Sequence, residues 1–222
     1  MANAAADHSD TSGRVLSLGR VDQLRVRVAY GRKLDGPSHH VFLLDVPLAG
    51  VEEAFDEMPY LEALEPILYA GAGAPREYSV HLNRHHTSVG AVAGRVEIGM
   101  DLTTGGRTST LSTPALDAVT LAFRSVLDRA GGSEHLELRH DDAIVRARVQ
   151  VHEAYPELNP DELSVSDEEH RAAQGSWSVG LRTSDLNRYV VVVGFLDGYP
   201  GSAHILHEPR SEVLDSVGSE VP

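Results

Sequence analysis

The sequence predicts an α+β protein in which helices pack on one face of an antiparallel sheet. Several short segments alternate apolar and polar residues, as DQLRVRVAY does at 22–30, and this period of two is typical of half-buried strands. The segment 113–130 instead repeats its apolar residues every three or four positions, which is typical of an amphipathic helix. The mixture of the two patterns gives the α+β class.

The first elements are expected to be two strands. In the segment 22–30, the polar residues Gln23, Arg25 and Arg27 would occupy the face opposite the apolar one. The run HVFLLDV at 40–46 predicts the second strand, because it is short and almost entirely apolar. The apolar face of the first strand would consist of Leu24, Val26, Val28 and Tyr30.

The acidic segment 51–71 is expected to be helical. One short helix would end at Met58 and a second would begin at Pro59, because proline is favoured in the first turn. Pro66 disturbs the continuation, since proline in a helix interior removes a hydrogen bond. The acids would lie on the solvent side of four apolar residues, Phe55, Leu61, Leu64 and Leu68.

Strands are expected again after this helical segment. The alternating segments 76–84 and 89–102 predict two of them. The TTGG sequence at 103–106 suits a hairpin turn, which would lead into a partner strand at 107–112.

The strongest local prediction is the helix that follows. Thr113 can cap it, Pro114 suits its first position, and Gly131 ends it. Its buried stripe would consist of Leu116, Val119, Phe123, Val126, Leu127 and Ala130.

The remainder of the chain is expected to be mostly strands and surface loops. The segments 134–140 and 144–152 alternate, which predicts two strands joined at Asp141 and Asp142. The polar, acidic segment 155–175 predicts a surface excursion.

The last segments of this part are a strand and an ambiguous stretch. The segment 176–181 predicts a strand. The segment 183–198 fits either structure, because Ser184 could cap a helix whereas four consecutive valines favour a strand.

The length of 222 residues predicts one domain over 14–201, which the glycine-rich GAGAP loop could divide into halves at 14–71 and 76–201. The polar ends, 1–13 and 202–222, show no sustained period and are expected to be flexible tails.

Composition limits the function classes. The net charge of −14 opposes binding to nucleic acid or to an anionic membrane. The absence of cysteine excludes disulfides, thiol nucleophiles and cysteine-bound zinc. The longest apolar run, 189–196, is too short to span a bilayer, and the N-terminal sequence lacks signal-peptide features, so a cytoplasmic protein is expected.

The stretch HLNRHHTSVG contains three of the 12 histidines. In a strand, His81 and His85 would share one face about 13 Å apart, too far to bind one metal ion, while His86 would face the opposite way. We therefore expect no metal site and no cofactor. The remaining candidates are expected at the surface, and these are His39, His40, His135, His140, His204 and His207.

No motif for a nucleophile or a phosphate loop is present, since the sequence lacks G-x-S-x-G and the glycine-rich AGAGAP lacks the following Lys-Ser/Thr pair. Adjacent acids such as Glu52 and Glu53 point apart on a helix or strand and are expected to be solvated surface charge.

Four features in order suggest a family resemblance: the strand and turn at 96–110, the proline-started helix at 113–131, the strand pair at 135–151, and the segment 176–194. Together they make residues 95–199 resemble the C-terminal allosteric, dimerising domain of 2-isopropylmalate synthase.

The resemblance implies a dimer that binds leucine at its interface, and a helix that begins within 182–196. Pro114 and the pair Asp117 and Ala118 match the helix start of that family, and Gly180 matches one glycine of a later Gly-x-Gly. Two glycines that the family has before the proline are replaced here by serine and threonine.

The sequence therefore favours a non-catalytic small-molecule-binding or regulatory module that forms a homodimer. Its expected ligand is a small carboxylate, held near Thr113, Pro114 and Gly180 by backbone NH groups at the helix start. Packing of the helix explains the same residues without a ligand.

Two alternatives stay open. An acidic inhibitor or immunity protein would cover the basic surface of a partner protein with the acids of 51–65 and 153–169. A small enzyme would use His81, His85 or His86 as a general base beside a carboxylate.

Overall fold

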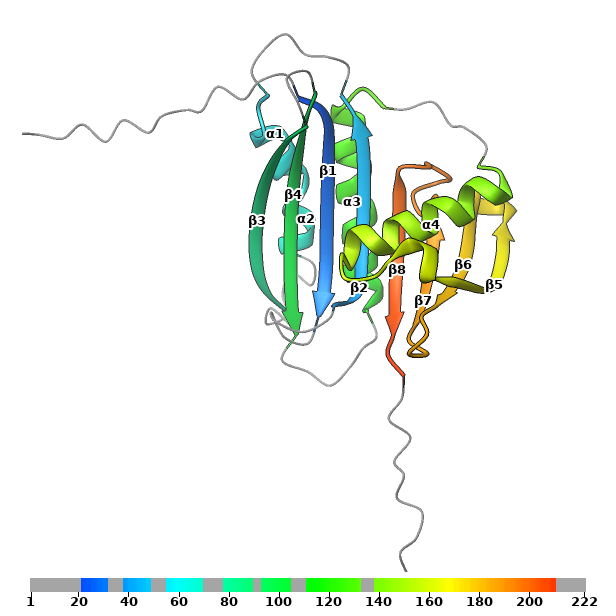
Figure 1. The fold of residues 1–222 in the computed structure, drawn as a ribbon. Coiled ribbons are helices and arrows are strands. Elements are labelled where there is room, and N and C mark those ends of the chain that lie inside the picture. Colours follow the sequence, from blue (N-terminus) through cyan, green and yellow to red (C-terminus); the bar gives the residue numbers. More distant parts are fainter. Residues whose placement is uncertain are drawn as a thin grey trace, which may run out of the picture.

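The computed structural model describes residues 21–31, 38–48, 55–69, 78–89, 93–104, 111–132 and 138–210, with side chains at all of these except 78–79, 85–89, 93 and 104. Within these ranges, eight strands form one open sheet in the order β3-β4-β1-β2-β8-β7-β6-β5 (Figure 1). Neighbouring strands are antiparallel, except that β1 and β4 run parallel. The predicted α+β class is confirmed.

The strands are β1 (Val21–Gly31), β2 (Ser38–Pro47), β3 (Tyr78–Val89), β4 (Ala93–Thr104), β5 (Ser164–Arg171), β6 (Ser176–Arg182), β7 (Arg188–Val193) and β8 (Ser202–Glu208). The helices are α1 (Met58–Ala63), α2 (Glu65–Leu68), α3 (Thr113–Arg129) and α4 (His140–Ala154), with short 3-10 turns at Pro160–Glu162 and Ala172–Gln174.

Helices α1, α2 and α3 cover one face of the first half of the sheet. Leu24, Val26 and Val28 of β1 are fully buried and belong to the same apolar cluster as Val119 and Phe123 of α3. Helices α1 and α2 pack against α3. The predicted faces of β1 are therefore confirmed, and α3 forms where the helical period predicts it.

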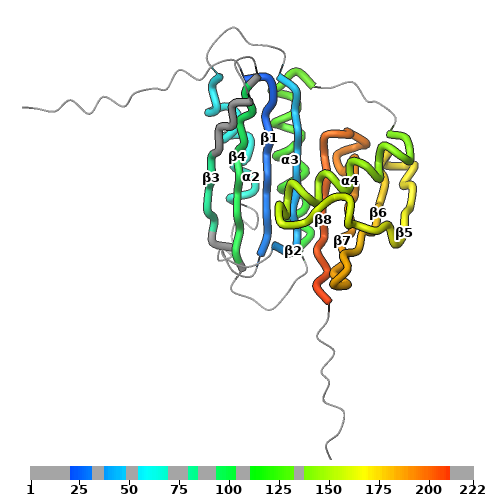
Figure 2. Tube along the Cα trace, in the orientation of Figure 1, coloured from blue at the N-terminus to red at the C-terminus, as the bar shows by residue number. Residues whose placement is uncertain are grey.

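Helix α4 covers the opposite face of the sheet, over the second half (Figures 1 and 2). Strand β2 lies at the junction and is buried on both sides. Phe42 and Leu44 belong to the cluster under α3, whereas Val41 and Leu43 belong to the cluster under α4. Double burial explains why this strand is apolar rather than alternating. Each half has its helices on one face, and the two halves use opposite faces of the sheet.

The alternation at 134–140 and 144–152 predicts two strands, and this prediction is wrong. Residues 140–154 form α4, whose buried residues include Ala143, Ala147 and Val151 at helical spacing. Residues 133–137 lie outside the described part of the chain.

The error at α4 has a simple physical origin. A residue pattern with apolar side chains at every second position also places some of them every fourth position, so both periods fit. Val145 is 60% exposed, so the helix leaves part of the apparent strand face in solvent. Asp141 and Asp142 lie in the first helical turn, where negative charge is favourable, instead of at a turn between strands.

The prediction of a tail from residue 202 is also wrong over Ser202–Glu208. These residues form β8, which lies in the middle of the sheet between β2 and β7. Ala203 and Ile205 are buried in the second apolar cluster. Seven residues suffice for a strand but are too few to show a clear period in a sequence.

The ambiguous segment 183–198 contains strand β7, so the β preference of the consecutive valines prevails. The helix that the family resemblance implies within 182–196 is therefore wrong. The acidic segment 155–175 is exposed as predicted, but it includes the edge strand β5, all of whose residues are exposed.

The GAGAP loop falls outside the described residues, yet β2 before it and β3 after it belong to the same sheet. Helices cover one face of the sheet up to β2 and the opposite face from β8 onward, so the covered face changes at the β2–β8 pair. The expected strand at 107–112 and the N-terminal tail lie mostly outside the described residues as well.

Two smaller outcomes concern the helices. Ser112, rather than Thr113, has the extended backbone of a cap residue, and Pro114 lies in the first turn. The separation of α1 from α2 at Leu64, just before Pro66, agrees with the expected disturbance. No helix in the described ranges is long and apolar enough to cross a membrane.

Candidate functional site

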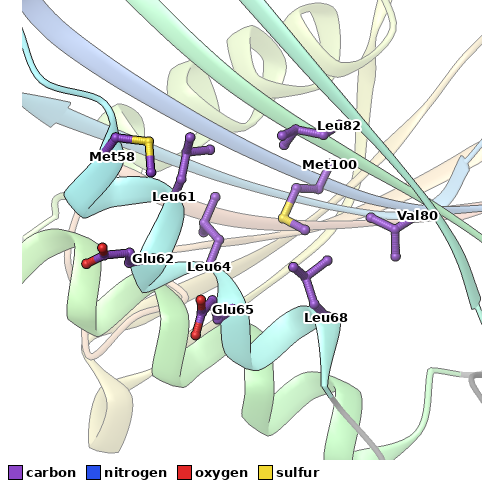
Figure 3. Close-up of a pocket in the computed structure, with 9 residues that line it drawn as sticks. All are labelled: Met58, Leu61, Glu62, Leu64, Glu65, Leu68, Val80, Leu82 and Met100. Carbon is purple, nitrogen blue, oxygen red and sulfur yellow. The ribbon is translucent and has the colours of Figure 1, made fainter.

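A cavity in the described part of the protein lies between the α1–α2 segment and strands β3 and β4 (Figure 3). Its volume is about 240 Å³. Leu61, Leu64 and Leu68 point from the helices toward the sheet, where they face Val80 and Met100. The described residues that line it are Met58, Leu61, Glu62, Leu64, Glu65, Leu68, Val80, Leu82 and Met100. We call this cavity the α1–α2 pocket.

Local sequence explains the shape of the pocket wall. The break between α1 and α2 at Leu64 interrupts the helix, and Pro66 follows in the first turn of α2. Because the two helices are only six and four residues long, they cover the edge of the sheet incompletely. Met58 and Leu82 consequently remain 56% and 41% exposed. Such large exposed apolar residues beside a cavity often mark a binding site.

Charged residues surround the mouth of the α1–α2 pocket. Glu62 and Glu65 are exposed, and their carboxylates are directed away from the sheet. Glu62 has only a distant ion pair, 3.8 Å from Arg129. Arg84 of β3 is paired with Glu57 at 2.6 Å. The mouth is therefore acidic, while the interior is apolar.

The histidine-rich stretch forms an edge strand of the sheet, and two of its three histidine side chains lie outside the described residues. The strand prediction for the stretch after residue 80 is confirmed by β3, and His81 is exposed opposite Asp101 of β4. His85 and His86 lie opposite Glu97 and Val96, but their side chains lie outside the description. No group of three potential metal ligands occurs among the residues that are described.

A histidine with two acidic partners occurs elsewhere, at the start of α4. His140 lies 2.8 Å from Glu168 and 2.9 Å from Asp141, and these hydrogen bonds raise the pKa of its imidazole. Its ring contacts the edge of Trp177, whose other neighbour is His170. The sequence offers no signal for this pairing, because Glu168 lies on β5, distant along the chain.

Two histidines predicted in a C-terminal tail are instead packed on opposite faces of β8. The ring of His204 stacks on Phe42 at 4.2 Å and contacts His40 through ring nitrogens 3.1 Å apart. His207 is buried and stacks on Tyr189 at 4.7 Å. Burial lowers the pKa of both histidines, to about 3 for His204. His207 packs with the cluster under α4, whereas His204 packs against Phe42 of the cluster under α3.

The expected carboxylate site is distributed over separate elements. Thr113 and Pro114 are exposed at the start of α3. Gly180 lies in β6, three strands beyond β2, against which α3 packs. The side chain of Asp167 covers Gly180, so that a Cβ atom at this position would overlap its carboxylate. Close packing therefore accounts for this glycine, and the role of all three residues in ligand binding stays a prediction.

A second polar cluster lies on the face of β1 and β4 opposite α3, beside the end of α4. Arg25 donates hydrogen bonds to Asp45 at 2.6 and 2.7 Å and to Glu153 at 2.6 Å. Nearby, Asp101 accepts hydrogen bonds from Arg27 and Asn83, both at 2.7 Å. These charges neutralise one another, so the cluster resembles a structural network more than a binding site.

Comparisons with known proteins do not assign the chain to a family. No protein family model, no curated protein and no solved structure matches it. The α1–α2 pocket must therefore be interpreted from its own chemistry.

Proposed function

We propose that this protein is a non-catalytic binding protein whose α1–α2 pocket holds a small apolar group. The observation that carries this proposal is the cavity of about 240 Å³ with Leu, Met and Val side chains on its walls. An engineered apolar cavity of about 150 Å³ holds benzene, so an aromatic ring with a short substituent is a reasonable size.

The chemistry of the lining favours binding over catalysis. The only titratable side chains among the lining residues are Glu62 and Glu65, which are exposed at the mouth. General acid–base catalysis needs a titratable group beside the reacting atoms. Walls of leucine and methionine offer burial and adaptable packing instead.

Methionine methyl NMR provides a direct test. The chain has three methionines, and two of them, Met58 and Met100, line the pocket. Titration with uncharged 2-phenylethanol should shift the methyl signals of Met58 and Met100 in a saturable manner. Unchanged signals for both lining methionines at saturating alcohol would contradict the proposal.

A blocked pocket provides the matched control. Leu68→Trp should fill the cavity and abolish the methyl shifts, because residue 68 points into the space between helix and sheet. Leu121→Trp adds the same indole at a side chain that is 58% exposed on α3 and should leave binding intact. Circular dichroism and thermal unfolding of both variants establish that each is folded.

A second candidate function is binding to a basic partner protein, and strand β5 is the observation that favours it. This strand forms one edge of the sheet, all its residues are exposed, and it carries Asp167, Glu168 and Glu169 in succession. An edge strand can pair with an extended segment of another protein. Such an association should weaken steeply with salt in a pull-down, and a salt-independent association would count against it.

A further inference from the structure

The α1–α2 pocket combines an apolar interior with an acidic mouth. Glu62 and Glu65 flank the opening on the helix side, and Asp56 and Glu57 precede α1. Arg84 and Arg129 are the positive charges paired with acids of this group, at 2.6 and 3.8 Å. Among the described residues, four carboxylates against two guanidinium groups give the mouth a negative charge.

From this combination we propose that the ligand is an amphiphilic cation, an apolar ring or chain that ends in an amine. The proposal rests on the proposed function of the same pocket. The apolar part would lie against Leu64 and Met100, both of which are almost fully buried. The ammonium group would remain at the mouth, close to water and to the carboxylates of Glu62 and Glu65.

The geometry of the acids supports this orientation of the ligand. Their carboxylates are directed away from Val80 and Met100, so the interior contains no charge that an apolar ring would have to desolvate (Figure 3). A buried ammonium would lose most of its hydration, whereas one at the mouth keeps it. A ligand carboxylate at the same place would be repelled by the acids, which disfavours the small carboxylate expected from the sequence.

The expected selectivity is modest because the acids are exposed. An exposed ion pair contributes about 0.2–1 kcal/mol, which corresponds to a factor of about 1.4–5 in affinity. Two carboxylates near one ammonium should therefore favour the amine over an uncharged analogue by about twofold to 25-fold, and disfavour a carboxylate by a similar factor.

A series of ligands with one ring and different head groups tests the proposal. We would measure the affinities of 2-phenylethylamine, 2-phenylethanol and phenylacetate at neutral pH and low salt, from the methyl signals of Met58 and Met100. The predicted order is amine, then alcohol, then carboxylate. Equal affinities would overturn the charge preference but retain the proposed function, whereas no binding of any ligand would remove both.

Variants at the mouth separate local charge from the net charge of the chain. Glu62→Gln combined with Glu65→Gln should reduce the preference for the amine over the alcohol to less than about twofold. Asp142→Asn combined with Asp185→Asn removes the same amount of charge from exposed positions of α4 and of the turn between β6 and β7, and should leave the preference unchanged. If the mouth variant keeps the full preference, the assignment of these two acids is wrong.

Discussion

Gly180 illustrates how the size of one residue can determine the position of a neighbouring side chain. The carboxylate of Asp167 occupies the space that a Cβ atom at position 180 would need. Asp167 is held there by Arg188, 3.1 Å away, and by the hydroxyl of Ser166 at 2.6 Å. These contacts lower the pKa of Asp167, with the Ser166 hydrogen bond as the largest cause. A larger residue at 180 must displace this carboxylate.

We expect Gly180→Ala to decrease the free energy of unfolding by about 1 kcal/mol, because the methyl group would push Asp167 away from Arg188. Urea unfolding followed by the fluorescence of Trp177, the only tryptophan, measures this change. In an Asp167→Ala background, the same substitution should cost much less. An equal cost in both backgrounds would show that Asp167 is not the obstacle.

His204 determines part of the acid sensitivity of the fold. Burial of the ring is the largest cause that lowers its pKa to about 3 from an ordinary value of 6.5, and His40 and Arg171 lower it further. Between these two pH values, the unfolded chain therefore binds more protons at this residue than the folded one. The free energy of unfolding then decreases as pH falls from 6.5 toward 3.

We expect His204→Leu to flatten this pH dependence, because leucine keeps an apolar contact with Phe42 but cannot be protonated. The contribution of His204 should approach about 1.4 kcal/mol per pH unit inside the window. Urea unfolding of wild type and variant at several pH values measures the difference. His81→Leu, at an exposed position of β3, is the control and should retain the wild-type slope. Parallel pH profiles of H204L and wild type would contradict the account.

At the scale of elements, the local patterns that could be predicted are those with one dominant period. Strands β1, β3 and β6 and helix α3 follow from alternation or helical spacing, and β2 follows from its short apolar run. Helix α4 could not be recognised, because its small buried residues Ala143 and Ala147 fit a strand equally well. Strand β8 is short, and its pairing partner β2 is distant in the chain.

If residues 140–154 form helix α4, substitutions at positions 145 and 147 should change the free energy of unfolding by different amounts. Ala147→Leu should decrease the free energy of unfolding by about 1–3 kcal/mol, because residue 147 is fully buried against the sheet. Val145→Lys should change it by less than about 0.5 kcal/mol, because Val145 is 60% exposed. In a strand, residues 145 and 147 would share one face and respond alike. Thermal or urea unfolding of the two variants distinguishes these outcomes.

The candidate site was predictable only in part. The helical side with Leu61, Leu64 and Leu68 follows from the sequence, and these residues form one wall of the α1–α2 pocket. The opposite wall comes from β3 and β4, and only the folded sheet brings Leu82 and Met100 opposite that helical segment. A contact of this kind depends on strand order, which a single sequence does not specify.

At the scale of the whole molecule, the Arg25 network joins the two halves. Arg25 of β1 is buried, with its guanidinium shared between Asp45 of β2 and Glu153 of α4. Gln150 of α4 adds a hydrogen bond to Asp45 at 3.3 Å. The helices of the two halves cover opposite faces of the sheet. In this cluster, α4 of the second half contacts β1 of the first through Glu153 and Arg25.

We expect Arg25→Met to decrease the free energy of unfolding by about 3 kcal/mol, because the substitution leaves two partly buried carboxylates without their shared partner. Arg27→Met, on the same face of β1, should cost less than about 1 kcal/mol, since its ion pair with Asp101 is more exposed. Urea unfolding of both variants gives the comparison. Similar costs for the two would contradict the structural role of the Arg25 network.

If the α1–α2 pocket binds an apolar group, the position of the bound ligand in the protein can be measured directly. Intermolecular nuclear Overhauser effects between the ring protons of 2-phenylethylamine and the methyl groups of the protein would locate the ligand. We predict contacts to the methyl groups of Met58, Met100 and Leu68, which face the cavity from both walls. Contacts confined to methyl groups outside this lining, or none with saturating ligand, would contradict the claim.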